Sequence, residues 1–171
     1  MNNMKVDKIY FDMDGVLANF DKGVVELGHG TLITQENTTP ESDKALWDAV
    51  RSVDHFFDKL EPMENAKKLF DLVYDKYGDK CEILTAIPKP NKNILHAGED
   101  KTSWVRRELS KDIVVNVVYK ADKKNYCHGE SYILIDDYSK NIEEWKEFGG
   151  IGILHKDAES TIKELEELNI L

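Results

Sequence analysis

The chain has 171 residues, of which 33 are acidic and 23 are basic, and its formal net charge is -10 at pH 7. This length fits one compact α/β domain with a modest insertion, and it excludes two full domains. The negative charge would repel a nucleic-acid polymer, whereas a small phosphorylated ligand remains compatible with it, because a few lysines and a divalent cation can set the local potential.

The N-terminal residues lack the pattern of a secretory signal, and no stretch approaches the apolar length needed to cross a bilayer. We therefore expect a cytoplasmic protein that does not associate with membranes. The oligomeric state stays open, with a homodimer as one option.

Five short apolar runs, rich in β-branched residues, predict β-strands at residues 6–11, 81–86, 113–119, 132–135 and 151–154. Between and after them, apolar residues at helical spacing predict helices that contain Phe70, Trp104, Trp145 and Leu165. Strands that alternate with helices of this length indicate a Rossmann-like parallel sheet covered on both faces. Ligands bind such sheets beyond the carboxyl ends of the strands.

Residues 16–62 interrupt this alternation. They contain two helical stretches, 19–27 and 43–53, and a polar loop, 31–42, but no convincing strand. We interpret them as a small helical cap inserted after the first strand, so that residues 1–15 and 63–171 form the core. A segment that leaves the sheet at this point can cover the ligand crevice as a lid.

Three of the predicted strands end in residues that can carry chemistry. Asp12 and Asp14 follow the first strand, Thr85 lies at the end of the second, and Asp136 and Asp137 follow the fourth. Each has an ordinary structural explanation as well: a turn, a threonine bonded to its own backbone, or helix-capping residues. Four carboxylates at one edge of a sheet nevertheless repel one another unless a cation relieves them, and carboxylate oxygens suit Mg²⁺.

Lysines lie near the same predicted edge. Lys101 is expected at the start of the helix that contains Trp104, and Lys120, Lys123 and Lys124 follow the third strand. A single lysine is usually a solvated surface charge. In a loop after a strand, however, it can reach the crevice and balance the charge of a bound phosphate.

Taken in order, Asp-x-Asp, Thr, Lys and Asp-Asp at strand ends resemble the haloacid dehalogenase (HAD) superfamily of aspartate-based phosphatases. The segments DMDGVLANF, LTA, KTSWV and LIDD resemble more closely the 5'-nucleotidases of the cytosolic and mitochondrial deoxyribonucleotidase type. The resemblance spans nearly the whole chain and is loosest in the insertion. It implies a Rossmann-like core with a helical cap, Mg²⁺ as cofactor, and hydrolysis of nucleoside monophosphates.

The resemblance also implies a role for each matching residue. Asp12 would be the nucleophile that forms an aspartyl-phosphate, and Asp14 would be the general acid and then the base, offering its backbone carbonyl to the metal. The other implied roles are phosphate binding by Thr85, Lys101 and Lys123, Mg²⁺ binding by Asp136 and Asp137, and a base-side wall at Phe20. Ala86 stands where the family often has a second hydroxyl, so backbone alone would make that phosphate contact. Lys123 matches the family better than Lys120 or Lys124, because it follows Asp122.

Three alternatives remain. The same chemistry could act on another small ester such as a sugar phosphate, since the cap sets substrate choice. A signalling receiver domain also combines paired acids, threonine and lysine, but there the paired acids follow the first strand and the lysine follows the last. An inactive binding module would not need both Asp12 and Asp14.

Overall fold

The computed structural model describes residues 4–28 and 38–171. Five parallel strands form one sheet in the order β3-β2-β1-β4-β5. They are β1 (Lys8–Phe11), β2 (Cys81–Ala86), β3 (Val114–Val118), β4 (Tyr132–Asp136) and β5 (Ile151–Leu154). The predicted α/β class and all five predicted strands are therefore confirmed, with ends that shift by at most two residues.

The strand order places the ligand site. The order 3-2-1-4-5 is that of a doubly wound sheet, whose crevice opens where the chain changes direction, between β1 and β4. Receiver domains have the order 2-1-3-4-5 instead, so the strand order argues against that alternative.

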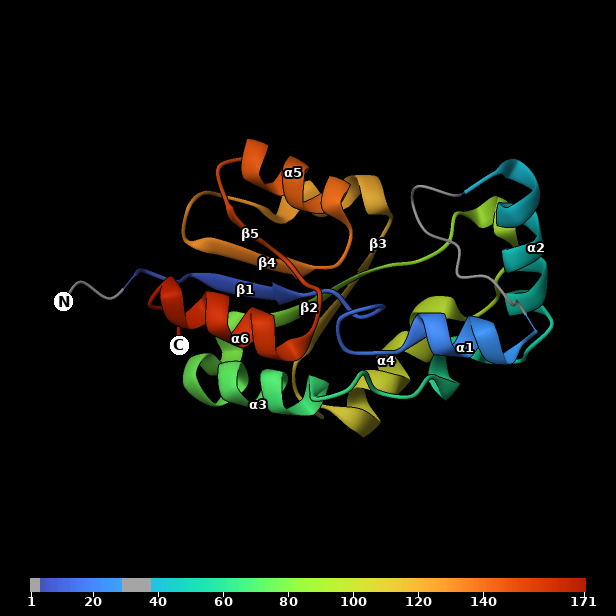
Figure 1. Cartoon of the computed structure of the whole chain (residues 1–171), viewed down its shortest axis with the longest axis horizontal. Coiled ribbons are helices and arrows are strands. Elements are labelled where there is room, and N and C mark those ends of the chain that lie inside the picture. Colours follow the sequence, from blue (N-terminus) through green and yellow to red (C-terminus); the bar gives the residue numbers. More distant parts are fainter. Residues whose placement is uncertain (1–3, 29–37) are drawn as a thin grey trace.

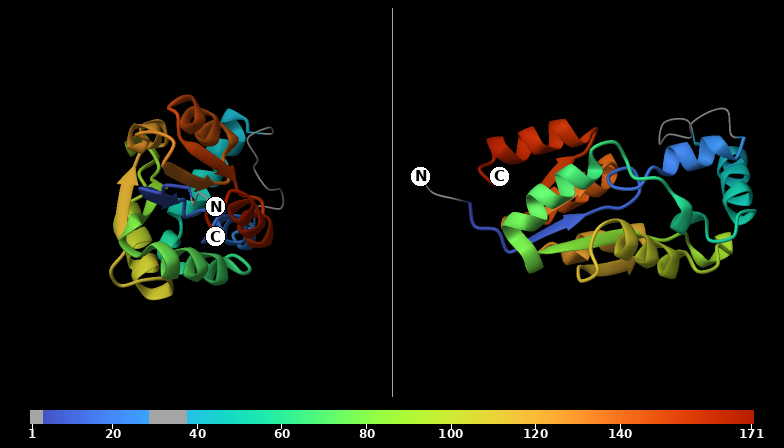
Figure 2. Two further views of the ribbon diagram at one scale, coloured as in Figure 1. Left: turned by 90° about the vertical axis from the view of Figure 1, so that its left-hand side faces the viewer. Right: turned by 90° about the horizontal axis from the view of Figure 1, so that it is seen from below.

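Helices cover both faces of the sheet (Figures 1 and 2). One face packs against α3 (Ala66–Tyr77), α4 (Ala97–Glu108) and α6 (Ala158–Glu167), and the other against α5 (Ser139–Glu147) and the 3₁₀ helix η4 (Lys120–Tyr126). Two short 3₁₀ helices, η2 (Gly78–Lys80) and η3 (Pro90–Lys92), flank β2. Within the described ranges, no helix is both long and apolar enough to span a membrane.

The position of β1 at the centre of the sheet explains why apolar and aromatic residues follow one another from Ile9 to Phe11. Ile9 and Phe11 point into the cluster that contains α3 and α6, whereas Tyr10 packs against Trp145 of α5 with ring centroids 5.7 Å apart. A strand buried on both faces needs apolar side chains at every position. Each large side chain buried in this way contributes about 1.5–3 kcal/mol, which fixes the sheet edge beneath the site.

The inserted segment, residues 16–62, contains α1 (Phe20–Glu26), α2 (Pro40–Arg51) and the 3₁₀ helix η1 (Phe56–Lys59). It lies beyond the carboxyl ends of the strands, at the end of the molecule opposite the C-terminus (Figures 1 and 2). The chain leaves and re-enters the core side by side, since Ala18 forms an antiparallel bridge with Pro62. The boundaries 16 and 62 themselves stay a prediction.

Two helix starts differ from the prediction. Helix α2 begins three residues early because Thr39 caps it, in a reciprocal capping box with Ser42, and because Pro40 suits the first helical turn. Helix α4 begins at Ala97, so Lys101 lies in its second turn rather than at its start. Most of the predicted polar loop 31–42 lies outside the described residues.

The second half of the inserted segment is bound along α4. Arg107 donates to the Asp58 carboxylate at 2.8 Å, and the indole N–H of Trp104 donates to the carbonyl of Leu60 at 2.7 Å. In the first turn of α4, the buried Asp100 carboxylate lies 2.7 Å from His55 Nδ1. These contacts attach η1 to the core independently of the chain crossing at Ala18.

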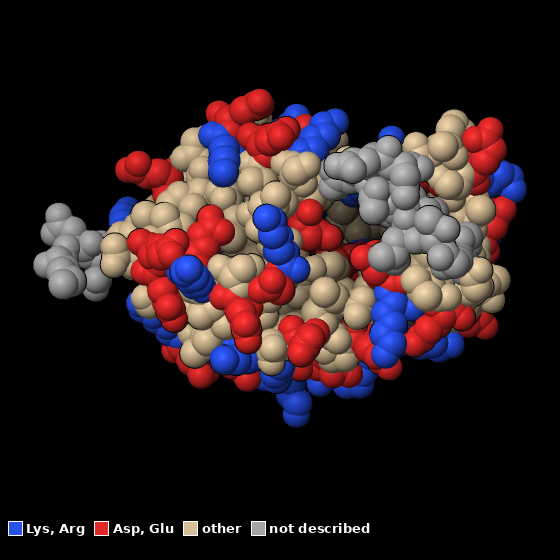
Figure 3. Space-filling view, viewed as in Figure 1, with Lys and Arg blue, Asp and Glu red and all other residues tan. Residues whose placement is uncertain are grey.

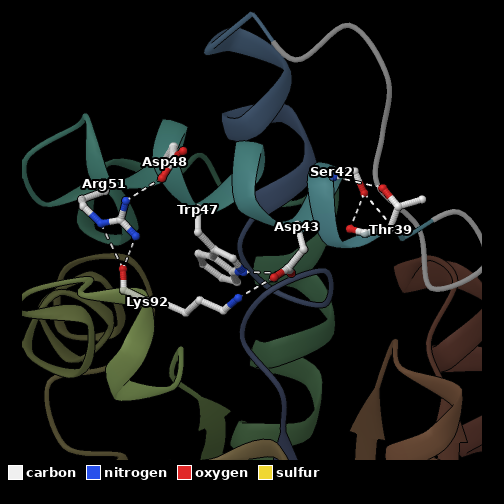
Figure 4. A network of polar contacts seen from close by, with 7 residues as sticks. All are labelled: Thr39, Ser42, Asp43, Trp47, Asp48, Arg51 and Lys92. Carbon is white, nitrogen blue, oxygen red and sulfur yellow. Dashed lines mark hydrogen bonds and ion pairs between the residues drawn. The ribbon is translucent and has the colours of Figure 1, made fainter.

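Helix α2 contacts a different part of the core, the loop after β2 (Figure 4). The ammonium of Lys92 pairs with Asp43, which also accepts from the indole N–H of Trp47 at 3.1 Å. Arg51 donates to the carbonyl oxygen of Lys92 at 3.0 Å through Nε and to Asp48 at 2.8 Å. The inserted segment is thus joined to the core on two sides.

Candidate active site

The predicted site residues gather at the carboxyl ends of three adjacent strands. Asp12 follows β1, Thr85 lies near the end of β2, and Asp136 ends β4. All three are buried. On the face shown in Figure 3, the surface is hollowed between the core and the inserted segment, and acidic side chains lie at its border.

Lys123 lies at the centre of this edge. Its ammonium donates to Asp12 Oδ1 at 2.8 Å and to Asp136 Oδ2 at 2.9 Å, and its side chain is 3% exposed. Burial alone would lower the pKa of Lys123, but the two carboxylates outweigh it and raise that pKa above its usual value. The lysine is therefore a fixed positive charge at the site.

The two neighbouring lysines do not share this position. The ammonium of Lys120 lies 4.1 Å from the centre of the Tyr138 ring, and that of Lys124 lies 5.9 Å from the centre of the Phe148 ring. In the 3₁₀ helix η4 the adjacent residue Lys124 points in another direction from Lys123. Lys120 is the first residue of η4 and lies over the Tyr138 ring, so Lys123 is the lysine that is buried at the site.

Lys101 is the second buried ammonium of the site. It donates to Asp14 Oδ2 at 2.7 Å, to the Thr85 hydroxyl oxygen at 3.1 Å and to the carbonyl oxygen of Ala86 at 2.6 Å. It also lies 4.5 Å from the centre of the Phe57 ring, which belongs to the inserted segment. Lys101 therefore links the ends of β1 and β2 with η1.

Three carboxylates crowd the same edge. Oxygen atoms of Asp12, Asp136 and Asp137 lie within 4.8 Å of one another, and they form the one such acidic group among the described residues. The pKa values of Asp136 and Asp137 are both raised, first because neighbouring protein atoms exclude water and then because Asp12 is negatively charged. Asp137 keeps contact with solvent on its outer side.

Asp136 is already well supplied with donors. Its Oδ1 accepts from the backbone N–H of Tyr138 at 2.9 Å, and its Oδ2 accepts from Asn141 Nδ2 at 3.1 Å in addition to Lys123. Sequence reasoning missed Asn141. A signal was available, because Asn141 precedes Ile142 on the apolar face of its helix, where a polar side chain needs a partner.

Asp14 is held by one oxygen only. Its Oδ2 is bound by Lys101, whereas its Oδ1 is buried and has no hydrogen-bond partner among the described residues. A buried carboxylate oxygen without a donor is costly in a resting protein. This oxygen is available for a proton or for a hydrogen bond from a bound ligand.

Gly15 allows Asp137 to approach the loop after β1. It has φ +83°, and a Cβ added there would lie 2.0 Å from Asp137 Oδ2. Its N–H donates to Ala18 at 2.9 Å, which closes the turn that carries the chain into the inserted segment. A side chain at position 15 would therefore strain the backbone and displace a carboxylate.

Phe20 lies in a cluster of four aromatic rings in the inserted segment. Its ring is stacked on that of Phe57, with centroids 6.0 Å apart, and it also contacts Phe56 and Trp47. Through Phe57, this cluster contacts Lys101. The aromatic residues of the inserted segment thus extend to the edge of the candidate active site.

Comparison with known proteins agrees with this geometry. The profile of a family described as "5' nucleotidase, deoxy (Pyrimidine), cytosolic type C protein" matches residues 5–166. The chain belongs to this family. A protein of Vibrio phage KVP40, named "Putative 5'(3')-deoxyribonucleotidase", is 31% identical over 140 residues, which cover 80% of this chain and 71% of the phage protein.

Solved structures show the same fold as this nucleotidase. A HAD family hydrolase from Deinococcus radiodurans, with bound phosphate and sodium, superposes with a TM-score of 0.59 at 12% identity, covering 97% of each chain. A HAD-superfamily hydrolase from Ehrlichia chaffeensis gives a TM-score of 0.57 at 14% identity, covering 96% of this chain and 98% of the other. Membership of the nucleotidase family makes the chain a phosphatase of this type, and the solved structures show that it has the Rossmann-like fold of HAD hydrolases. The predicted family, enzyme class and fold are confirmed.

Replacing Gly15 by alanine tests the turn that brings Asp137 to the site. We expect Gly15→Ala to lower the free energy of unfolding by about 1–3 kcal/mol through backbone strain, and to lower phosphatase activity on the order of 100-fold because Asp137 is displaced. Urea unfolding and initial rates measure the two effects.

Gly149→Ala is the matched control. Gly149 has φ +88°, but a Cβ there would meet nothing within 4 Å. It should lose stability through the same strain while keeping its activity. Equal activity losses in both variants would contradict the role assigned to Gly15.

Proposed function

We propose that this nucleotidase is a Mg²⁺-dependent phosphomonoesterase that hydrolyses nucleoside and deoxynucleoside 5'-monophosphates through an aspartyl-phosphate on Asp12. The observation that carries the proposal is the setting of Asp12. This buried carboxylate is held by Lys123 through one oxygen and lies within the acidic group formed with Asp136 and Asp137. Membership of the nucleotidase family supports the same chemistry.

The acidic group fits a magnesium ion. The Lys123 ammonium binds two of the three carboxylates, those of Asp12 and Asp136, so the group keeps a negative excess, and hard oxygen ligands are those that Mg²⁺ prefers. Asp137 is the freer ligand, because the oxygens of Asp136 already accept from three donors. Asp12, Asp137 and the backbone carbonyl of Asp14 would hold the ion, with Asp136 supporting them. When bound, Mg²⁺ offsets the negative charge of the phosphate and of Asp12.

In the first step, the Asp12 oxygen that Lys123 does not hold attacks the phosphorus of the monoester. The bond between phosphorus and the nucleoside oxygen breaks, and Asp14 gives its proton to that leaving oxygen. Lys101 orients Asp14 through Oδ2, which leaves the unpartnered Oδ1 to carry the proton.

In the second step, Asp14 takes a proton from water. The water oxygen attacks phosphorus, the bond to Asp12 breaks, and inorganic phosphate is released. Thr85, the backbone at Ala86, Lys101 and Lys123 would bind the phosphate oxygens and would supply donors and positive charge, and the contacts of Lys101 with Thr85 and Ala86 support this assignment.

The inserted segment would supply the nucleoside side of the pocket. Phe20 heads the aromatic cluster, and stacking on an aromatic ring tolerates several bases at about 1–3 kcal/mol per base. Among the described residues on the face in Figure 3, acidic and basic side chains are interspersed, which suits a small ligand better than a nucleic-acid polymer.

A phosphate-release screen over nucleoside monophosphates and sugar phosphates tests the proposed substrate. With Mg²⁺ present, we expect the highest kcat/KM for a nucleoside or deoxynucleoside 5'-monophosphate, and loss of that activity after dialysis against EDTA. A screen in which sugar phosphates react faster than every nucleotide would contradict the substrate while leaving the phosphatase chemistry intact.

Asp12→Asn tests the nucleophile. An amide cannot form the acyl-phosphate, so we expect at least about a 10³-fold loss of kcat in a folded protein, as is typical when a covalent nucleophile is removed. Asp7→Asn is the control, because Asp7 precedes the opposite end of β1 and bonds Ser131. Turnover by Asp12→Asn within severalfold of that control would contradict the mechanism.

Asp137→Asn tests whether Asp137 lowers the stability of the metal-free protein and raises its affinity for Mg²⁺. In EDTA the variant should melt higher than wild type, by about 2–4 °C for each kcal/mol of repulsion removed. Burial, and then the negative charge of Asp12, raise the pKa of Asp137. The cost of this carboxyl to folding therefore grows as pH rises from the pKa of the unfolded chain towards the raised pKa, and it disappears in acid, where the carboxyl is protonated in both states.

With Mg²⁺ added, the order should reverse. Wild type should gain thermal stability from the bound ion, whereas Asp137→Asn should gain less and should need at least about tenfold more Mg²⁺ for half-maximal activity. Equal melting temperatures of the two proteins under both conditions would contradict the placement of the ion beside Asp137.

A further inference from the structure

Asn141 is a buried polar side chain whose position the proposed chemistry does not explain. It lies in the first turn of α5, on the face that also buries Ile142 and Trp145, and it is 6% exposed. An amide placed there without a partner would cost about 1–3 kcal/mol. Its Nδ2 donates to Asp136 Oδ2 at 3.1 Å, so the side chain is directed at the acidic edge rather than at its own helix.

Asp136 Oδ2 is a shared acceptor. It receives a hydrogen bond from Asn141 and, at 2.9 Å, one from Lys123, whose ammonium also binds Asp12 at 2.8 Å. The backbone N–H of Tyr138 fixes the other oxygen of Asp136 at 2.9 Å. The Asp136 carboxylate is therefore held at both oxygens, and only the Asn141 bond comes from a side chain without charge.

We propose that Asn141 is a positioning residue that orients Asp136 and, through it, keeps the Lys123 ammonium shared with Asp12. This role rests on the proposed function. Without the Asn141 donor, Oδ2 would depend on Lys123 alone and would draw the ammonium away from Asp12. The nucleophile would then lose the donor that orients its carboxylate.

The neutrality of Asn141 is part of this role. A lysine or arginine at position 141 would also bind Asp136, but it would cancel the negative excess that attracts a divalent cation. An asparagine satisfies the buried carboxylate without adding charge. It therefore holds the Asp136 carboxylate in place without reducing the negative charge of the site.

The test compares three variants. Asn141→Leu removes the donor at similar size, and Asn141→Asp keeps the shape but replaces the donor by an acceptor. Asn116→Leu is the matched control, because Asn116 is a partly buried amide in β3 that bonds Glu82 at 2.9 Å, away from the strand ends. Each is measured for melting temperature, for Mg²⁺ affinity by calorimetry without substrate, and for kcat and KM.

Both Asn141 variants should turn over about 10–100-fold more slowly than wild type, with KM within severalfold, and Asn141→Leu should bind Mg²⁺ about 10–100-fold less tightly, as is typical for residues that orient metal ligands. Asn116→Leu should lose stability but keep its Mg²⁺ affinity and kcat within about twofold of wild type, a much smaller change than reorienting a metal ligand brings. If Asn141→Asp behaves like wild type, the side chain serves packing and the proposal is overturned. Equal losses in the Asn116→Leu control would overturn it as well.

The calorimetric measurement tests the positioning role of Asn141 separately from the proposed substrate, because it needs no substrate. Wild-type protein that binds Mg²⁺ but hydrolyses no nucleotide would contradict the proposed function. In that case the Mg²⁺ affinity of Asn141→Leu would still test the positioning role, and an affinity equal to that of wild type would overturn it.

Discussion

The ammonium of Lys123, shared between Asp12 and Asp136, is the interaction on which the rest of the site depends. Moving an ammonium out of water costs several kcal/mol, and only close carboxylates with good geometry offset that cost. The two contacts, at 2.8 and 2.9 Å, exist because β1 and β4 are neighbours in the sheet and because η4 folds back over their ends. The strand order is thus a precondition of the chemistry.

The two buried lysines leave the site with different charge balances. Lys101 pairs with one carboxylate, that of Asp14, and is also surrounded by neutral oxygens and the Phe57 ring. Lys123 binds the carboxylates of Asp12 and Asp136, and Asp137 adds a third carboxylate to this group. The negative excess therefore lies on the side of β4, where a cation would bind, and the β2 side is left for the anionic phosphate. One sheet edge thus offers two neighbouring regions, one suited to a cation and the other suited to an anion.

Much of this arrangement could be predicted from the sequence, because strand ends follow from local apolar runs and parallel strands bring those ends together. The contacts that could not be predicted depend on which faces meet in the folded chain. Asn141 lies four residues after Asp137, and its place on an apolar helix face indicates a partner, but only the folded chain shows that this partner is Asp136. Phe57 meets Lys101 only because η1 packs on α4. Helix α2 begins earlier than the apolar pattern predicts, because Thr39 and Pro40 form a capping signal inside a polar stretch.

The loop after β2 binds α2 through two contacts that differ in how they respond to sequence change. The Lys92 side chain pairs with Asp43, a contact that any residue other than lysine or arginine would lose. Arg51 instead binds the main-chain carbonyl of residue 92, which every amino acid provides. Evolution can therefore alter the loop residue and retune how firmly the inserted segment is held, while the second contact preserves its docking position.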